Sequence, residues 1–82
     1  MNMPMQDKSK WKPLEDLAVR RPEIKPAEFM FMGMVDEIHV YKHINTRRYI
    51  NVHPNGNTFA YDPVTNSYNR VSNLTAVSDA LT

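Results

Sequence analysis

Residues 38–71 read IHVYKHINTRRYINVHPNGNTFAYDPVTNSYNRV, and this stretch decides the fold of the chain. Apolar and polar side chains alternate along it, which is typical of β-strands that bury one face. Asn55-Gly56 separates two of the alternating runs. The pair predicts a two-residue type I′ turn, because both central positions of that turn need a positive φ.

A two-residue turn fixes the register of the strands on either side of it. It pairs Val52 with Phe59 and Ile50 with Tyr61. Since cross-strand partners share a face of the sheet, these four side chains are predicted to form one apolar patch.

Residues 38–44 alternate in the same way and predict a preceding strand, joined to the next by Asn45-Thr46-Arg47. A three-residue loop places Val40 opposite Val52, whereas a two-residue loop would place it opposite Asn51. The other face is then predicted to carry three exposed cross-strand pairs: His39 with His53, Tyr41 with Asn51, and His43 with Tyr49.

Asp62-Pro63 suits the first two positions of a type I turn. A turn there pairs Tyr61 with Tyr68 and predicts a further strand over residues 68–71.

Residues 29–35 are apolar on both faces and can add a fifth strand to the sheet. Strict alternation predicts that Met30, Met32 and Met34 share one face. Either a helix covers each face and the methionines belong to the core, or one face docks a partner or a second copy, because Met-rich surfaces are adaptable.

The segments around the sheet are expected to be a disordered tail (1–10), a short helix with a Pro-containing linker (11–28), and the meander itself with a C-terminal helix (29–82). Pro13 suits the first position of the short helix. The C-terminal helix has Leu74, Val77, Ala80 and Leu81 on one side. This side is predicted to cover Val40, Ile50, Val52, Phe59 and Tyr61.

The expected fold class is therefore α+β, with a small antiparallel meander of three to four strands, a fifth strand from residues 29–35, and two short helices. A chain of 82 residues makes one domain with a limited core. The absence of cysteine excludes disulfides and thiolate metal sites and fits a reducing compartment. The longest apolar run is too short to cross a bilayer and residues 1–12 do not resemble a signal peptide, so we expect a cytoplasmic protein.

Chemistry-bearing patterns are weak along the whole chain. The three histidines could face one another, but no carboxylate or cysteine within residues 38–53 completes a metal site. Gly33 and Gly56 are the only glycines, which excludes a phosphate-cradling loop. No serine has a base at a defined spacing. We expect no enzymatic activity, no cofactor and no bound metal.

The first hypothesis is a small regulator or inhibitor that binds a larger protein. Aromatic, Met and Arg side chains are enriched at interface cores, and the residues expected to bind are Trp11, Arg20, Arg21, Met30, Met32 and Met34. A small cysteine-free chain of this kind suits a phage-type modulator of a host machine, such as RNA polymerase in transcription or a defence complex. A homodimer through the strand at residues 29–35 is the simpler alternative.

The second hypothesis is nucleic-acid binding by the polar and aromatic face. The residues expected to contact nucleic acid are Tyr41, Lys42, His43, Arg47, Arg48 and Tyr49. Residues 38–71 hold four basic side chains against one acidic one, a net charge of +3, while the whole chain carries only +1. This modest charge favours a protein partner over nucleic acid. No membrane partner is expected.

Overall fold

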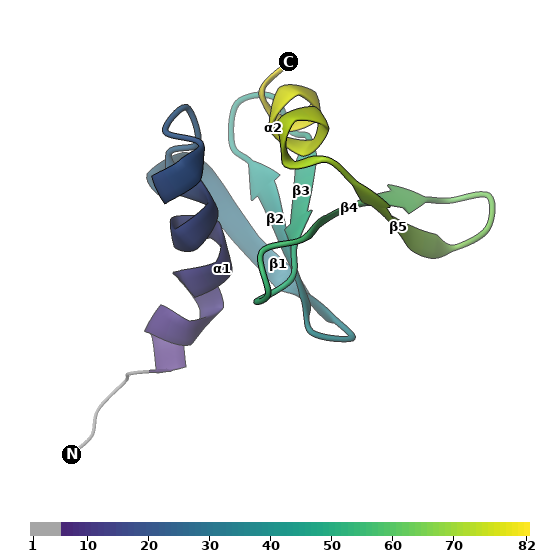
Figure 1. The fold of residues 1–82 in the computed structure, drawn as a ribbon, viewed down its shortest axis with the longest axis horizontal. Helices are drawn as coiled ribbons and strands as arrows, with labels where there is room; N and C mark the ends of the chain where they lie inside the picture. The colour runs from purple at the N-terminus through teal and green to yellow at the C-terminus, as the bar shows by residue number, and fades with distance from the viewer. Residues whose placement is uncertain (1–5) are drawn as a thin grey trace.

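The computed structural model describes residues 6–82. They form an antiparallel sheet, preceded in the chain by one helix and followed by another (Figure 1). In chain order the elements are α1 (Gln6–Arg20), the 3-10 turn η1 (Pro26–Glu28), β1 (Phe29–Val35), β2 (Ile38–His43), β3 (Tyr49–Val52), β4 (Thr58–Asp62), β5 (Ser67–Val71) and α2 (Asn73–Leu81). The strand order is β1-β2-β3-β4-β5, so each strand pairs with its neighbour in sequence. The predicted α+β class is confirmed, and residues 29–35 supply the fifth strand.

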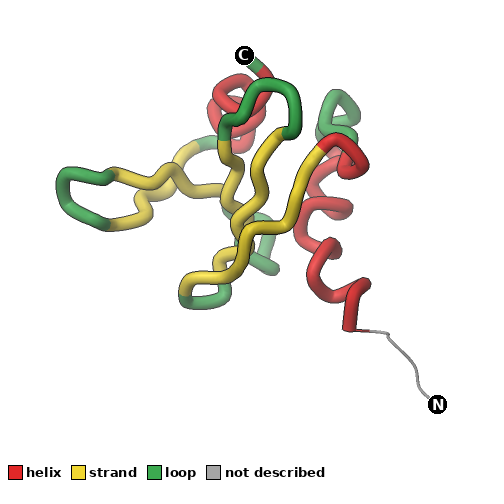
Figure 2. Tube along the Cα trace, turned by 180° about the vertical axis from the view of Figure 1, so that it is seen from behind, coloured by secondary structure: helices red, strands yellow, loops and turns green. Residues whose placement is uncertain are grey.

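Both helices pack into one core on the same face of the sheet, which we call the helix-covered face. Side chains of both helices, of the segment before β1 and of three strands make up this core: Leu14, Leu17, Ile24, Phe29, Tyr41, Ile50, Val52, Ala76, Val77 and Ala80. Figures 1 and 2 show the tip of the β4–β5 hairpin extending away from both helices. The core therefore draws on β1–β3, and neither helix covers the tip of the hairpin.

The opposite face, which we call the open face, receives no core side chain from either helix. Strand alternation and register place on it Met30, Val35, Ile38, Val40, Lys42, Tyr49, Asn51, Phe59, Tyr61, Tyr68 and Arg70. Ile38, Val40 and Asn51 in its middle are buried. Its outer apolar side chains remain exposed, at 42% for both Met30 and Val35 and at 46–48% for Tyr61 and Tyr49.

Helix α1 begins earlier than predicted. Residues 1–5 of the predicted tail lie outside the described residues, but residues 6–10 are helical. Pro13 lies inside the helix rather than at its first position, which costs the helix one backbone hydrogen bond. Burial of Pro13, Leu14 and Leu17 offsets this loss, because tertiary packing supplies most helix stability.

Strand β1 contains a β-bulge, so the predicted methionine stripe is wrong. The pairing with β2 shifts between Phe31 and Gly33, which leaves Met32 as the extra residue. Met30 pairs with Lys42 on the open face, whereas Met34 pairs with His39 on the helix-covered face. All three methionines are exposed, but they do not share a face.

The predicted β2–β3 register is wrong by one residue. His39 pairs with Val52, Val40 with Asn51, and Tyr41 with Ile50. The loop holds the four residues 44–47 rather than three, because the His43 amide donates to the Arg48 carbonyl (2.8 Å) and Arg47 adopts φ 67°. A slip of one residue exchanges the two faces, so Tyr41, His39 and His43 turn toward the helices.

The turn between β3 and β4 is also not the predicted type I′ hairpin. The Gly56 amide donates to the His53 carbonyl (2.9 Å), and the His53 amide donates to the Asn57 carbonyl (2.9 Å). The loop is therefore Pro54-Asn55-Gly56, with only Gly56 at positive φ (95°). A type I′ turn would require Pro54 to donate a hydrogen bond to Asn57, and proline has no amide hydrogen. Asn51 consequently pairs with Phe59 and Val52 with Thr58.

The β4–β5 hairpin and the start of α2 agree with the sequence. Tyr61 pairs with Tyr68 as predicted. The Asp62 carboxylate accepts a hydrogen bond from the Val64 amide (2.9 Å), as expected where an aspartate opens a turn. Ser72 caps α2 by accepting a hydrogen bond from the Thr75 amide (3.0 Å).

The surface that α2 covers differs from the prediction. Val77 and Ala80 are buried against a core that includes Ile50 and Val52, whereas Leu74 is 58% exposed. Val40, Phe59 and Tyr61 lie on the open face, because the two register shifts move them there.

None of the helices formed by residues 6–82 has the length and hydrophobicity needed to cross a membrane.

Candidate binding pocket in the fork between strands β3 and β4

Strands β3 and β4 separate soon after the turn that joins them. They pair at Val52↔Thr58 and Asn51↔Phe59, after which β3 continues beside β2 and β4 continues beside β5. The separation leaves a fork, which opens between Ile50 on one arm and Ala60 on the other.

Asn51 stands at the point where the fork opens. It is buried (4% exposed), and its side-chain amide donates a hydrogen bond to the Phe59 carbonyl (3.0 Å). A side chain thus contributes to the last contact between the two strands. Buried polar groups are costly without partners, so this hydrogen bond helps to fix the position of the fork.

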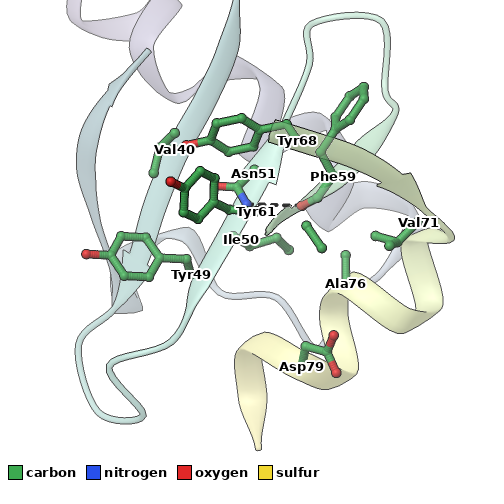
Figure 3. A pocket seen from close by; sticks show the side chains of 11 residues that line it. Val40, Tyr49, Ile50, Asn51, Phe59, Tyr61, Tyr68, Val71, Ala76 and Asp79 are labelled. Atoms are coloured by element: carbon green, nitrogen blue, oxygen red, sulfur yellow. Dashed lines mark hydrogen bonds between the residues drawn. The ribbon is translucent and has the colours of Figure 1, made fainter. Parts of the chain in front are cut away.

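A pocket of about 490 Å³ occupies the fork (Figure 3). It is lined by Val40, Tyr49, Ile50, Asn51, Phe59, Ala60, Tyr61, Tyr68, Val71, Ala76 and Asp79. These residues come from both faces of the sheet and from α2, so the pocket passes between β3 and β4. Its volume lies in the range of small-ligand sites, about 300–1,000 Å³.

Three tyrosines line the pocket. The rings of Tyr61 and Tyr68 lie 5.1 Å apart at 50°, and Figure 3 shows both next to Val40. The Tyr61 hydroxyl donates to Asn66 Oδ1 (2.5 Å), which restrains that ring. Tyr49 lies on the β3 arm, and the Lys42 ammonium lies 5.5 Å from the centre of its ring.

The pocket has an uneven charge. Asp79 on α2 is its only charged lining residue. Within the described residues the Asp79 carboxylate makes no ion pair. The lining thus carries one negative charge and no positive one, with the Lys42 ammonium next to it at the Tyr49 ring.

The structure separates the residues predicted to bind a protein. Trp11 packs into the helix layer, with its ring 5.4 Å from that of Tyr41. Arg20 and Arg21 lie at the end of α1, on the helix-covered side, while Met30 lies on the open face. The predicted binding residues therefore do not form one patch.

The residues predicted to contact nucleic acid are also divided. Tyr41 is fully buried and its hydroxyl donates to the Lys10 carbonyl (2.7 Å). Burial raises the pKa of Tyr41 well above its ordinary value; the nearby Leu14 backbone opposes this effect and the Glu15 charge adds to it. The predicted exposed face is wrong at this position.

Of the other nucleic-acid candidates, His43 is 5% exposed and faces the helix layer. Lys42 and Tyr49 pair across β2 and β3 on the open face. Arg47 and Arg48 are exposed between β2 and β3. Four of the six predicted residues thus remain accessible.

The histidine rings form hydrogen bonds with backbone groups of neighbouring turns. His43 Nδ1 accepts hydrogen bonds from the Asn45 and Thr46 amides (both 3.1 Å), so its Nε2 carries the proton and faces Glu28 Oε1 (3.4 Å). His53 Nδ1 accepts from the Asn55 amide (3.0 Å). His39 Nδ1 lies 3.0 Å from the Glu37 carbonyl. Within the described residues, no three His, Cys, Asp or Glu side chains are grouped so as to hold a metal ion.

Sequence reasoning did not assign the pocket residues Asn51, Phe59, Tyr61, Tyr68 and Asp79 to a site. The predicted Tyr61–Tyr68 pair was one available signal. The fork itself depends on where β3 leaves β4, which no local pattern marks.

Comparison of the chain with protein-family models, with curated proteins and with solved structures gave no match.

Proposed function

We propose that this protein is a non-enzymatic binding module that docks on a larger protein through the open face. The observation that carries the proposal is the exposure of Met30, Val35, Tyr49 and Tyr61 on a face to which neither helix contributes core side chains. Aromatic and Met side chains that stay exposed together are the kind that interfaces bury.

The charges on this face suggest the chemistry of the partner. Lys42 and Arg70 are its charged residues, and both are basic. A partner with an apolar patch and a rim of carboxylates would complement them. Since a cysteine-free chain needs no oxidising compartment, the proposal places this interaction in the cytoplasm. A phage-type modulator of a transcription or defence complex is one role that suits such a module.

The test compares exposed apolar residues on and off the open face. The full chain is immobilised, a stoichiometric protein is captured from lysate, and the purified pair is then measured by calorimetry. Met30→Asp and Val35→Asp should abolish binding, because each buries a charge in the interface. Val19→Asp is the matched control, since Val19 is 82% exposed on α1. Equal binding by all three variants would contradict the proposal.

Nucleic-acid binding is the second candidate, favoured by one observation. The Lys42 ammonium and the Tyr49 ring form a cation–π pair (5.5 Å) close in the chain to Arg47 and Arg48, which lie between β2 and β3. Bases could stack on exposed tyrosines while these cations reach phosphates. A gel shift with single-stranded DNA at low salt, lost on adding salt and weakened by Arg47→Ala with Arg48→Ala, would favour this candidate over a protein partner.

A further inference from the structure

The pocket in the fork combines aromatic rings with a single negative charge. Tyr49, Tyr61 and Tyr68 line the pocket, and Asp79 is the only charged residue of the lining. Phe59 also lines the pocket, but Figure 3 shows its ring pointing away from those of Tyr61 and Tyr68. No lysine or arginine lines it. The faces of aromatic rings carry partial negative charge, so each of these groups favours a positively charged occupant.

We propose that this pocket binds an organic cation, with a quaternary ammonium or guanidinium group packed against the tyrosine rings and Asp79 supplying a negative charge from α2. Such groups suit the site because they are weakly hydrated and fill space, whereas a metal ion would need more oxygen ligands than one carboxylate.

Tyr49 already receives a cation within the molecule. The Lys42 ammonium lies 5.5 Å from the centre of the Tyr49 ring, within the distance at which cation–π attraction acts. Lys42 does not line the pocket. The contact shows that this ring attracts a cation. It also places one positive charge beside the pocket, with which a ligand cation has to compete.

The rings are held in place before any ligand binds. Tyr61 and Tyr68 pack at 5.1 Å, and the Tyr61 hydroxyl is hydrogen-bonded to Asn66. The hydrogen bond from Asn51 to the Phe59 carbonyl fixes the closed end of the fork. Preorganised groups lose little conformational entropy on binding, which favours affinity from a small site.

Two sources could supply the cation: a free small molecule such as a quaternary amine, or the basic side chain of a protein. The chemistry of recognition is the same for both. A cation site in the fork stands whether or not a protein docks on the open face, because the free molecule needs no interface.

The experiment is an NMR titration of the full chain, following the tyrosine ring resonances. The probes are choline, its uncharged isostere 3,3-dimethylbutanol, and N-acetyl-arginine amide. Choline should bind about tenfold more tightly than the isostere, the difference expected from several cation–π contacts. The tighter of choline and N-acetyl-arginine amide indicates whether a free molecule or a side chain is the natural source.

Substitutions measure how much Asp79 and Tyr49 each contribute to choline binding. Asp79→Asn should weaken choline binding about threefold, while the charge-matched control Glu23→Gln should leave it unchanged. Tyr49→Leu should weaken binding more than Tyr49→Phe, because the phenyl ring keeps its negative face. Dispersed amide spectra verify that each variant is folded.

Two results would overturn the proposal. Equal affinity for choline and its isostere would show an ordinary apolar cavity. Unchanged tyrosine resonances with every probe, at the highest concentration that stays soluble, would show that the fork binds no cation.

Discussion

The side-chain amide of Asn51 donates a 3.0 Å hydrogen bond to the backbone carbonyl of Phe59, its partner across β3 and β4. This is the last pair between β3 and β4 before the strands diverge toward Tyr49 and Tyr61. Asn51 therefore belongs both to the last pair of the β3–β4 ladder and to the lining of the pocket.

Replacing Asn51 should destabilise the protein. Asn51→Ala removes the donor and leaves the Phe59 carbonyl without it, so the free energy of unfolding should fall by about 1–3 kcal/mol. Urea unfolding followed by circular dichroism measures the change. Asn69→Ala on exposed β5 is the control and should change stability by less than about 0.5 kcal/mol. Equal losses for the two variants would contradict the role given to Asn51.

Tyr41 should make stability fall in alkaline solution. Burial raises its pKa in the folded state above the ordinary 10.0, so the folded protein holds the phenolic proton more tightly than the unfolded chain does. This contribution is complete below pH 10 and is lost as pH rises from about 10 through the folded-state pKa. Unfolding free energies measured across this range should decline, and Tyr41→Phe should make the decline shallower.

Ultraviolet absorbance of the phenolate gives an independent check on Tyr41. In the folded wild type, one tyrosine should ionise only when the protein unfolds. If every tyrosine of the folded protein ionises together, Tyr41 is not shielded as the structure shows.

The two glycines should respond differently to alanine. A Cβ on Gly56 would lie 3.1 Å from Arg20 Nη2 at φ 95°, whereas a Cβ on Gly33 at φ 137° would meet no atom within 4 Å. Both substitutions should cost about 1 kcal/mol or more in backbone strain. Arg20→Ala should recover part of the loss only in the Gly56→Ala background. A double-mutant cycle measures this coupling, and equal coupling for both glycines would contradict it.

His43 and His53 should differ in their contribution to stability. His43 accepts two backbone hydrogen bonds, and its side chain is 6% exposed; His53 accepts one, and its side chain is 26% exposed. His43→Leu should lower the free energy of unfolding by about 1–3 kcal/mol, because two amides of the turn lose their acceptor. His53→Leu should lower it by less. The reverse order in thermal melts would show that the turn does not depend on His43.

The order of the strands could be predicted because alternation is a local property of the sequence. Tyr61 pairs with Tyr68 as the Asp62-Pro63 turn indicated, and the fifth strand and α2 also form. These elements need only the side chains within and next to them.

The registers of β2 with β3 and of β3 with β4 could not be predicted from the strongest turn signals alone. Asn55-Gly56 suits a type I′ turn, but the lack of an amide hydrogen on Pro54 outweighs it. At residues 44–47, the loop gains a residue because His43 caps it from within, and Arg47 accepts a positive φ. A hydrogen bond from a side chain to the backbone of a loop does not change the alternation of apolar and polar residues, so the alternation could not predict it.

The two wrong registers are also the reason that the sequence did not predict the pocket. In the predicted register Val52 and Phe59 pair, and the strands continue together past Ile50 and Tyr61. The observed register ends at Asn51 and Phe59, and the fork opens there. Tyr61, Tyr68 and Asp79 therefore looked like parts of a core and a helix surface, since only the tertiary structure brings them together.

The bulge at Met32 bears on the self-association of this protein through the edge of its sheet. Strand β1 is an outer strand of seven mostly apolar residues, a form that invites a neighbouring molecule to add its own strand and begin a fibril. The bulge breaks the even spacing of its outward amides and carbonyls and increases the local twist. Deleting Met32 would straighten this edge, and the chain would then be more prone to amyloid-like self-association at high concentration.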